Sequence, residues 1–447
     1  MTDKGEPSAK TAETAKRSLR LHSFYKGKIQ TLPKVPVSGL ADFALWYTPG
    51  VAAPCAAIRA DPDLVYEHTN KANAVAVVSD GTRVLGLGDI GPEAGLPVME
   101  GKALLFKYLG GVDAVPICLK TTGADDLIRA VQTLEPSFGG INLEDISQPK
   151  CFRVLEALRE KMNIPVWHDD QQGSATALLA GLFNALALVG KDLPRAKLAL
   201  IGMGAANAAT YRLLVACGAD PAAIIACDSK GTLHKRRGDI AESRDVYPEK
   251  WRVCTETNPE SLAGGIAEAL RGADVCIAFS RPGPGVIRRE DVANMAKDAV
   301  VFACANPVPE IWPDEALAAG ARIVATGRSD FPNQLNNSLV FPGLFRGVLD
   351  VRARRITDEM AIAAAHALAK FAQDRGASET AILPRMDEWE LAAHVAAAAG
   401  MKAQEQGVAR IAKSADALYA DACARINAAR EMTTALMREG LIAKAPD

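Results

Sequence analysis

Two patterns of apolar and polar residues alternate along most of the chain, one typical of buried strands and the other of helices. Short apolar runs occupy residues 74–79 (AVAVVS) and 114–119 (AVPICL), with a helical pattern between them at residues 99–109 (MEGKALLFKYL). Beyond about residue 164 the expected strands fall at 164–167, 197–202 and 223–228, and the expected helices at 174–189 and 207–218. Strands separated by helices of this length indicate βαβ units and a parallel sheet, so the fold class is α/β.

The same pattern divides the chain into four parts. Residues 1–18 are polar and are expected to form a loose tail, and residues 19–164 form one α/β unit. Residues 165–365 form a second domain around a parallel sheet. Residues 366–447 are rich in alanine and helical in pattern. These C-terminal helices are expected to pack on the core or to make a subunit interface.

Composition excludes several classes of protein. The 447 residues carry a net charge of -2, which gives no electrostatic reason to expect binding to nucleic acid, whose binders usually carry a basic face. The chain shows no apolar signal segment near its start and no run of 18 apolar residues, so neither secretion nor membrane spanning is expected. The nine cysteines lack C-x-x-C spacing and lie mostly in apolar runs, which is typical of reduced thiols in a cytoplasmic protein.

The literal G-x-G-x-x-G pattern lies at Gly86, Gly88 and Gly91. Pro92 follows it directly and Pro97 soon after, so no helix is expected to open where a pyrophosphate would need one. We interpret this segment as a turn or a close-packed loop rather than a dinucleotide site.

A second glycine motif, GMGAAN at residues 202–207, has the setting that a dinucleotide site requires. An expected strand precedes it, a helix follows it, and Asp228 ends the next strand. The candidate cofactor residues are Gly202, Gly204, Ala205, Ala206, Asn207, Asp228, Ser229 and Lys230. Asn207 replaces the third glycine and is expected to push helix and strand apart or to re-aim the loop. The alternative is an ordinary glycine turn in an α/β domain.

Asp228 bears on the choice between NAD⁺ and NADP⁺. An acid at this position accepts the ribose hydroxyls of NAD⁺ and repels a 2′-phosphate. This favours NAD⁺, although Ser229, Lys230 and the basic run at residues 235–237 could neutralise such a phosphate.

Two pairs of adjacent acids, Glu144-Asp145 and Asp169-Asp170, follow two expected strands separated by a helix. In a right-handed βαβ unit both pairs emerge at the carboxyl edge of one sheet. Four carboxylates at one edge repel one another unless a cation neutralises them, and oxygen ligands of this kind suit Mg²⁺ or Mn²⁺. The alternative is that the acids cap helices or pair with lysine and arginine.

Between about residues 21 and 365 the chain resembles the malic enzymes. The segments that carry the resemblance are YTPGVA (47–52), DGTRVLGLGDIG (80–91), GLPVMEGKALLFK (95–107), GGINLEDIS (139–147), HDDQQGS (168–174), CDSKG (227–231), ANPVPE (305–310), ATGRSDFPNQLNN (325–337) and FPGLFRG (341–347). The resemblance implies a malic-type catalytic domain at residues 19–164 and a Rossmann-like NAD(P)-binding domain at residues 165–365. It also implies oxidative decarboxylation of L-malate to pyruvate and CO₂ with NAD⁺ or NADP⁺ and Mg²⁺ or Mn²⁺.

The resemblance also assigns roles by position. Glu144, Asp145 and Asp170 match metal ligands, and Asp169 matches an acid beside the catalytic lysine. Lys102 matches the base for the malate hydroxyl, and Tyr47 the acid that protonates C3. Arg83 matches an arginine that holds a substrate carboxylate, and Asn306 and Asn337 match asparagines near nicotinamide and substrate. A homodimer or larger homo-oligomer is implied, with Tyr47 and Lys102 near a subunit interface.

Three other interpretations of the function are open. A malolactic or oxaloacetate-decarboxylating relative would keep the metal site without net cofactor reduction. A catalytically silent dinucleotide sensor would have no need of Tyr47, Lys102 and the acids together. An unrelated Rossmann amino-acid dehydrogenase would leave the acid pairs unexplained. The chain departs from the family at Gln172 and Asn207, and the segment from Arg281 to Gly285 has no assigned role.

Overall fold

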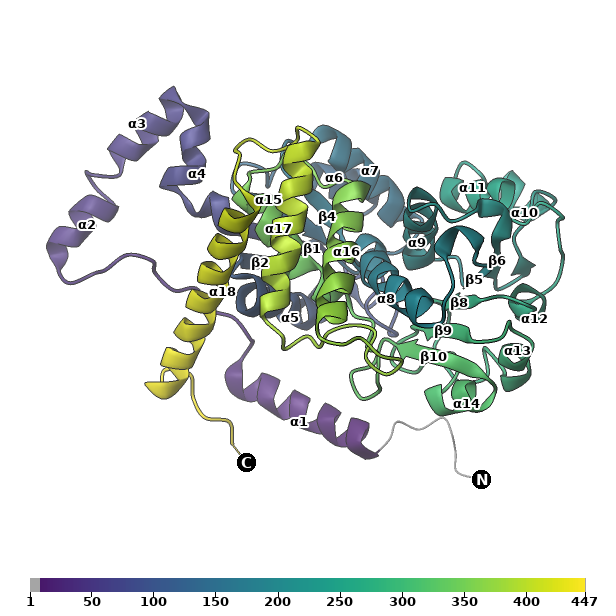
Figure 1. Ribbon diagram of the computed structural model, residues 1–447. Coiled ribbons are helices and arrows are strands. Elements are labelled where there is room, and N and C mark those ends of the chain that lie inside the picture. Colours follow the sequence, from purple (N-terminus) through teal and green to yellow (C-terminus); the bar gives the residue numbers. More distant parts are fainter. Residues whose placement is uncertain (1–8, 447) are drawn as a thin grey trace.

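The computed structural model describes residues 9–446 and contains two largely parallel sheets, each flanked by helices (Figure 1). The expected α/β class is therefore confirmed. Within the described residues, no helix is both long enough and apolar enough to cross a membrane.

The first sheet is built entirely of parallel strands in the order β2-β1-β3-β4. Its strands are β1 (Ala74–Ser79), β2 (Asp113–Cys118), β3 (Gly140–Leu143) and β4 (Val166–His168). The helices that connect them are α5 (Gly91–Gly110), α6 (Ala124–Gln132) and α7 (Lys150–Lys161). Because β4 pairs with β3, the expected domain boundary at residues 164/165 falls inside this sheet.

The second sheet has the order β10-β9-β8-β5-β6-β7, and only β7 is antiparallel to its neighbour. Its strands are β5 (Leu198–Ile201), β6 (Ile224–Asp228), β7 (Gly231–Thr232), β8 (Val275–Ala278), β9 (Ala299–Ala303) and β10 (Ala321–Thr326). Its helices are α8 (Ser174–Leu188), α9 (Ala205–Ala216), α10 (Gly238–Glu242), α11 (Pro248–Glu256), α12 (Ile266–Leu270), α13 (Arg289–Ala293) and α14 (Pro313–Ala318). The strand order reverses at β5, where α/β folds of this kind bind ligands.

The C-terminal helices return to both halves of the molecule. They are α15 (Phe341–Asp350), α16 (Asp358–Asp374), α17 (Glu390–Glu405) and α18 (Ala415–Arg438). Helices α15 and α18 pack on α5, and α16 packs on α8. The expected helical segment therefore exists, but its boundary at residue 366 falls within α16, and α15 and α16 are built into the core.

The N-terminal part is more extended than the rest. Residues 1–8 of the expected loose tail lie outside the described residues, and residues 9–18 form the first part of helix α1 (Ala9–Tyr25). Alanine, lysine and glutamate are strong helix formers, which explains why this polar stretch is helical. The next helices are α2 (Leu40–Trp46), α3 (Ala52–Ala60) and α4 (Val65–His68). We call residues 26–60 the N-terminal arm, because α2 and α3 project from the body of the molecule (Figure 1).

Candidate active site

The two acid pairs meet at one edge of the first sheet. Glu144 and Asp145 follow β3, Asp169 and Asp170 follow β4, and β3 and β4 are parallel neighbours. Glu144, Asp145 and Asp170 each offer a carboxylate oxygen, and these oxygens lie within 4.8 Å of one another. The topology expected from the sequence therefore brings sequence-distant carboxylates together.

The charge of these carboxylates is poorly compensated. Burial, followed by repulsion from Asp170, raises the pKa of Asp145 to about 8. Burial raises the pKa of Glu144 as well, against the opposing effect of Lys102. Oδ2 of Asp145 is buried and has no hydrogen-bond partner. Buried carboxylate oxygens without partners are costly, so the residues present fit a bound cation.

Lys102 lies against this cluster at the side of α5. Its Nζ is 2.6 Å from Oδ2 of Asp169 and 3.1 Å from Oε1 of Glu144. Trp167 donates its indole N–H to Oδ1 of Asp169 over 2.9 Å, which fixes the carboxylate between the two donors. A Cβ at Gly173 would lie 1.9 Å from Oδ1 of Asp169, so only glycine leaves room for this arrangement.

The electrostatics of Lys102 depend on its acidic neighbours. Burial alone would lower its pKa, but the carboxylates of Asp169 and Glu144 outweigh burial and raise the pKa above its ordinary value. A lysine can act as a base only when it is deprotonated, which a raised pKa opposes. A cation bound among the same carboxylates would lower the pKa of Lys102 again.

Asp145 is held in a backbone conformation that few residues adopt. Its φ is 55°, in the left-handed region that aspartate tolerates better than most side chains. Its backbone N–H donates to Oδ2 of Asp170 over 2.8 Å, and its carbonyl accepts from the N–H of Arg83 over 3.0 Å. The strained residue thus joins the two acid pairs and the loop that carries Arg83.

A cavity of about 740 Å³ opens at the carboxyl ends of β5 and β6. It is lined by five of the expected cofactor residues, Gly202, Gly204, Asp228, Ser229 and Lys230, and by Arg83 from the first domain. Gly202 has a φ of 84°, and a Cβ there would lie 2.5 Å from the carbonyl oxygen of Phe279. A dinucleotide-binding loop needs glycine where its backbone approaches a neighbouring group this closely.

Asn207 does not separate helix and strand as expected. It is fully buried, and Nδ2 donates to the carbonyl oxygens of Gly202 (2.6 Å), Ile201 (3.1 Å) and Ile277 (3.4 Å). The side chain therefore ties the first turn of α9 to β5 and β8. Ala205 and Ala206 begin α9 beside it, and neither lines the cavity.

Asn306 and Asn337 line a second cavity of about 170 Å³, together with Ser174 and Cys304. Phe279 borders both cavities, so the two lie next to each other. A Cβ at Gly327 would lie 2.6 Å from Nδ2 of Asn306, so this glycine makes room for the asparagine.

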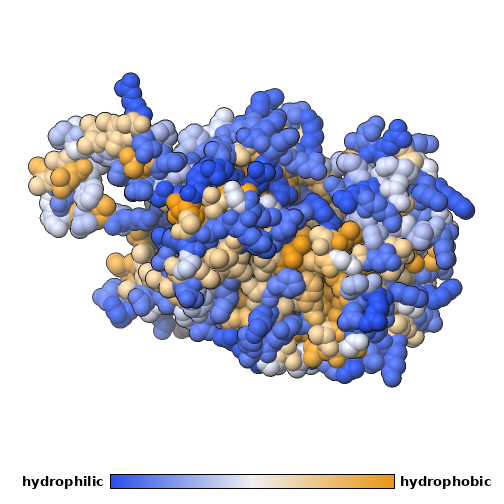
Figure 2. All heavy atoms as spheres, turned by 45° about the horizontal axis from the view of Figure 1, so that its top comes forward, coloured by the Kyte–Doolittle hydropathy of each residue, from blue (hydrophilic) through white to orange (hydrophobic). Residues whose placement is uncertain are grey.

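Tyr47 is the one expected catalytic residue that the single chain does not bring to the cluster. It follows α2 in the N-terminal arm, and the residue is 71% exposed. Figure 2 shows apolar residues gathered on this projecting part of the molecule. The large exposed apolar residues of α2 are Leu40, Phe43, Leu45 and Trp46.

The structure of the segment from Gly86 to Gly91 differs from the sequence-based expectation in one respect. Helix α5 does open at Gly91, with Pro92 in its first turn. Proline is well tolerated there because the first N–H groups of a helix need no internal partner. None of the three glycines lines the large cavity, and a Cβ at Gly86 would lie 3.1 Å from Pro307.

Sequence reasoning missed several residues of the large cavity. Gln148, Lys250 and Arg281 also line it. Arg281 belongs to the proline- and glycine-rich segment whose sequence indicates no role. Lys250 lies 22 residues after Asp228, and no local motif marks it.

Comparisons with known proteins agree with this geometry. Residues 26–159 match the family model for the malic enzyme N-terminal domain, and residues 171–404 match that for the malic enzyme NAD binding domain. An NAD-dependent malic enzyme of Geobacillus stearothermophilus is 49% identical over 86% of this chain and 78% of its own length. A bifunctional malic/malolactic enzyme of Bacillus subtilis is 48% identical over 88% of this chain and 94% of its own length.

Among solved structures, the malic enzyme of Entamoeba histolytica superposes with a TM-score of 0.95 at 48% identity. The match covers 98% of this chain and 93% of that one. The resemblance found in the sequence motifs is thus confirmed, and the chain belongs to the malic enzyme family.

Proposed function

We propose that the chain catalyses metal-dependent oxidative decarboxylation of L-malate to pyruvate and CO₂, with reduction of NAD⁺ or NADP⁺. One observation carries the proposal. Three carboxylates with ligand oxygens within 4.8 Å of one another adjoin a buried lysine, 3.1 Å from Glu144, at the edge of the first sheet. Arg83, beside this cluster, also lines the cavity at the glycine motif.

Glu144, Asp145 and Asp170 would hold Mg²⁺ or Mn²⁺. The unpartnered Oδ2 of Asp145 and the mutual repulsion of the acids support this ligand set. A divalent cation bound there supplies Lewis-acid polarisation of the substrate oxygens, which favours loss of CO₂ from the β-keto acid.

The side chains around the cluster fit the remaining steps. Lys102, as the neutral amine, would take the proton from the C2 hydroxyl of malate while Asp169 holds its Nζ in position. Arg83 would bind a substrate carboxylate, because a guanidinium matches that group with two parallel hydrogen bonds. Asn306 and Asn337 would orient substrate and nicotinamide from the smaller cavity. A nicotinamide held beside these two asparagines would supply the hydride acceptor that oxidation at C2 requires.

Tyr47 would protonate C3 of the enol, and for this it must reach the cluster from a second copy of the chain. Its exposure and the apolar surface of α2 support such an exchange between copies, because exposed apolar patches of this kind commonly mark protein interfaces. The proposed assembly is therefore a homodimer or a larger homo-oligomer. The nine free cysteines of each chain fit a reducing compartment, the cytoplasm.

Absorbance at 340 nm tests the reaction. Purified protein is supplied with L-malate, Mn²⁺ and either NAD⁺ or NADP⁺, with a parallel sample in EDTA, and pyruvate is measured at the end. We expect reduced cofactor and pyruvate in equal amounts, and neither in EDTA. Pyruvate production that persists in EDTA would contradict the metal requirement.

A second candidate reaction is malolactic conversion, which one relative carries in its name. In that case lactate would accumulate from malate without net reduced cofactor. Measuring lactate in the same samples separates the two reactions.

Mixing two inactive variants tests the exchange of Tyr47. If Tyr47 completes the active site that contains the Lys102 of another copy, Tyr47→Phe and Lys102→Ala dimers can complement each other. A mixture of the two that has exchanged subunits then regains about a quarter of wild-type activity. The statistical mixture then contains one intact site in each heterodimer. No recovery in a mixture whose subunit exchange is verified would show that each chain uses its own tyrosine.

A further inference from the structure

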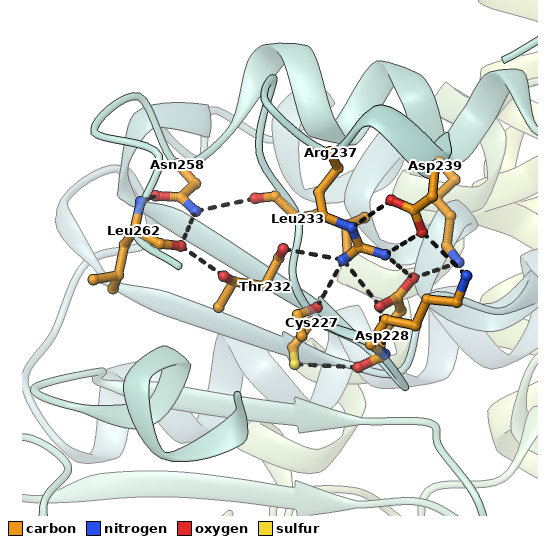
Figure 3. Close-up of polar contacts among 11 residues, drawn as sticks. Cys227, Asp228, Thr232, Leu233, Arg237, Asp239, Asn258 and Leu262 are labelled. Carbon is orange, nitrogen blue, oxygen red and sulfur yellow. Dashed lines mark hydrogen bonds and ion pairs between the residues drawn. The ribbon is translucent and has the colours of Figure 1, made fainter. Parts of the chain in front are cut away.

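Glu310 is a fully buried carboxylate that no basic side chain neutralises. It lies in the segment between β9 and α14, and none of its surface is exposed. Within the part of the chain that the structure describes, no lysine or arginine forms an ion pair with it. Asp228, at the same edge of the second sheet, instead accepts two N–H groups of Arg237 (Figure 3). Glu310 therefore depends on hydrogen bonds alone to offset the cost of its burial.

Three donors supply these hydrogen bonds. Oε1 of Glu310 accepts from the backbone N–H of Ser280 over 2.8 Å and from the hydroxyl of Ser280 over 2.9 Å. Oε2 accepts from the backbone N–H of Ala305 over 3.0 Å. Burial raises the pKa of Glu310, and the hydrogen bonds from Ala305 and Ser280 oppose this rise. An ionised carboxylate accepts at both oxygens, so the three donors match that form.

The donors belong to two loops that border different cavities. Ser280 follows β8 and lines the large cavity. Ala305 follows β9 and directly precedes Asn306, which lines the smaller cavity. Because β8 and β9 are parallel neighbours, both loops emerge at the same edge of the sheet. The carboxylate of Glu310 thus ties a wall of the proposed cofactor cavity to the asparagine proposed to orient substrate and nicotinamide.

The proline- and glycine-rich segment from Arg281 to Gly285 is held by the same part of the chain. The backbone N–H of Gly283 donates to the carbonyl oxygen of Val308 over 3.2 Å. The backbone N–H of Ile287 donates to the carbonyl oxygen of Glu310, also over 3.2 Å. Both the backbone and the side chain of Glu310 therefore fix the loop that follows β8.

From these contacts we infer that Glu310 is a positioning residue, which fixes the walls of the two cavities relative to each other and so sets the distance between the nicotinamide and C2 of malate. Glu310 lines neither cavity and acts through Ser280 and Asn306. The inference rests on the proposed function and adds a residue to it. Reacting atoms must lie about 3–3.5 Å apart, and a displacement of about 1 Å can cost about 10²-fold in rate. Small shifts of either loop should therefore slow hydride transfer.

Glu310→Gln in the full-length protein tests the inference. Glutamine keeps the size of the side chain, but its Nε2 would face the N–H of either Ser280 or Ala305 and so set a donor against a donor. We expect kcat for malate oxidation to fall by about 10- to 100-fold. With L-malate deuterated at C2, the isotope effect on kcat/KM should exceed that of the wild type, because hydride transfer limits the rate more strongly. Calorimetric titration with NADH or NADPH should still give the wild-type number of binding sites.

Ser280→Ala is a second, milder variant. It removes the hydroxyl donor and leaves both backbone donors to Glu310 in place. The loss of one hydrogen bond to a carboxylate should lower kcat by about 2- to 10-fold and raise the isotope effect in the same direction. Added to Glu310→Gln, it should have little further effect, because both changes act on one interaction.

Asp291→Asn is the matched control. Asp291 is also a buried acid of the second domain, 3% exposed, and it accepts the backbone N–H of Arg288 over 2.9 Å. It lines neither cavity. This variant should keep the wild-type kcat and isotope effect.

Two results for a folded Glu310→Gln would overturn the inference. The first is a near-normal kcat with an unchanged isotope effect. The second is a fall in kcat matched by a loss of cofactor-binding sites, because this would indicate a purely structural role. If Glu310→Gln does not fold, Ser280→Ala decides, and wild-type kinetics in that variant would overturn the inference. A failure of the proposed function is distinct, since the wild type itself would then not oxidise malate, and the inference would fall with it.

Discussion

Each domain carries a carboxylate cluster beside the carboxyl end of a parallel strand, and the two clusters differ in how their charge is balanced. At the first sheet, four acids gather near Lys102, which contacts two of them, Glu144 and Asp169. Burial lowers the pKa of His168 beside Asp170, so this residue adds little positive charge. At the second sheet, Asp228 and Asp239 face Arg237, Lys250 and Lys230.

The difference indicates what each cluster can bind. Acids that outnumber their basic neighbours need a cation from outside, and this explains the orphaned oxygen of Asp145. Acids whose charge is already balanced need no cation and do not repel an anion. On this account the same residue type would serve a metal site in one domain and an anion-tolerant site in the other.

The largest expected effect comes from removing the basic residue of the first cluster. In Lys102→Ala, kcat for malate oxidation should fall by about 10²- to 10⁴-fold, the usual contribution of general acid–base catalysis. Steady-state kinetics measures the fall, and calorimetry should show unchanged NAD⁺ binding. Lys107→Ala is the control on the same helix, because Lys107 pairs with Asp113 at 2.7 Å, away from the cluster. Near-normal turnover in Lys102→Ala would contradict the role of Lys102.

A smaller effect is expected from removing one acid of the proposed metal site. Asp170→Asn should raise the Mn²⁺ concentration for half-maximal activity by at least about 10- to 100-fold, the loss that changing only a hydrogen-bond partner of a metal ligand typically causes. The measurement is a metal titration of the initial rate. Asp125→Asn, which alters an aspartate of the same domain paired with Arg153, should leave the titration unchanged. A titration that Asp170→Asn does not alter would remove Asp170 from the ligand set.

The smallest expected effects are changes in protein stability, which should have opposite signs in the two clusters. In EDTA, Asp145→Asn relieves repulsion and should stabilise the protein by on the order of 1 kcal/mol, whereas Asp228→Asn leaves two cations short of a partner and should destabilise it by about 1–3 kcal/mol. Thermal unfolding should therefore show a higher Tm for the first variant and a lower one for the second. Shifts of the same sign would mean that the two clusters are balanced alike.

Sequence reasoning reached those parts of the site that depend on chain topology. The convergence of Glu144-Asp145 with Asp169-Asp170 follows from two parallel strands and one connecting helix, and the fingerprint at Gly202 follows from its place between β5 and α9. Both are properties of neighbouring elements, which periodicity and glycine placement can specify.

The remaining parts depend on side-chain contacts between distant residues. Lys250 reaches Asp228 from α11, and nothing in the sequence around Lys250 signals that pairing. Asn207 occupies a glycine position, yet three carbonyl oxygens accept its N–H groups, which spacing alone does not reveal. The position of Tyr47 in an exposed arm depends on the path of the chain before the first sheet.

Calorimetric titration of the metal-free protein with Mn²⁺ tests most directly whether the first cluster holds a cation. We predict about one strong site per chain in the wild type, and its loss when Glu144→Gln, Asp145→Asn and Asp170→Asn are combined. Circular dichroism would verify that the triple variant remains folded. Strong binding that persists with the same stoichiometry in the folded triple variant, or no binding in the wild type, would contradict the account.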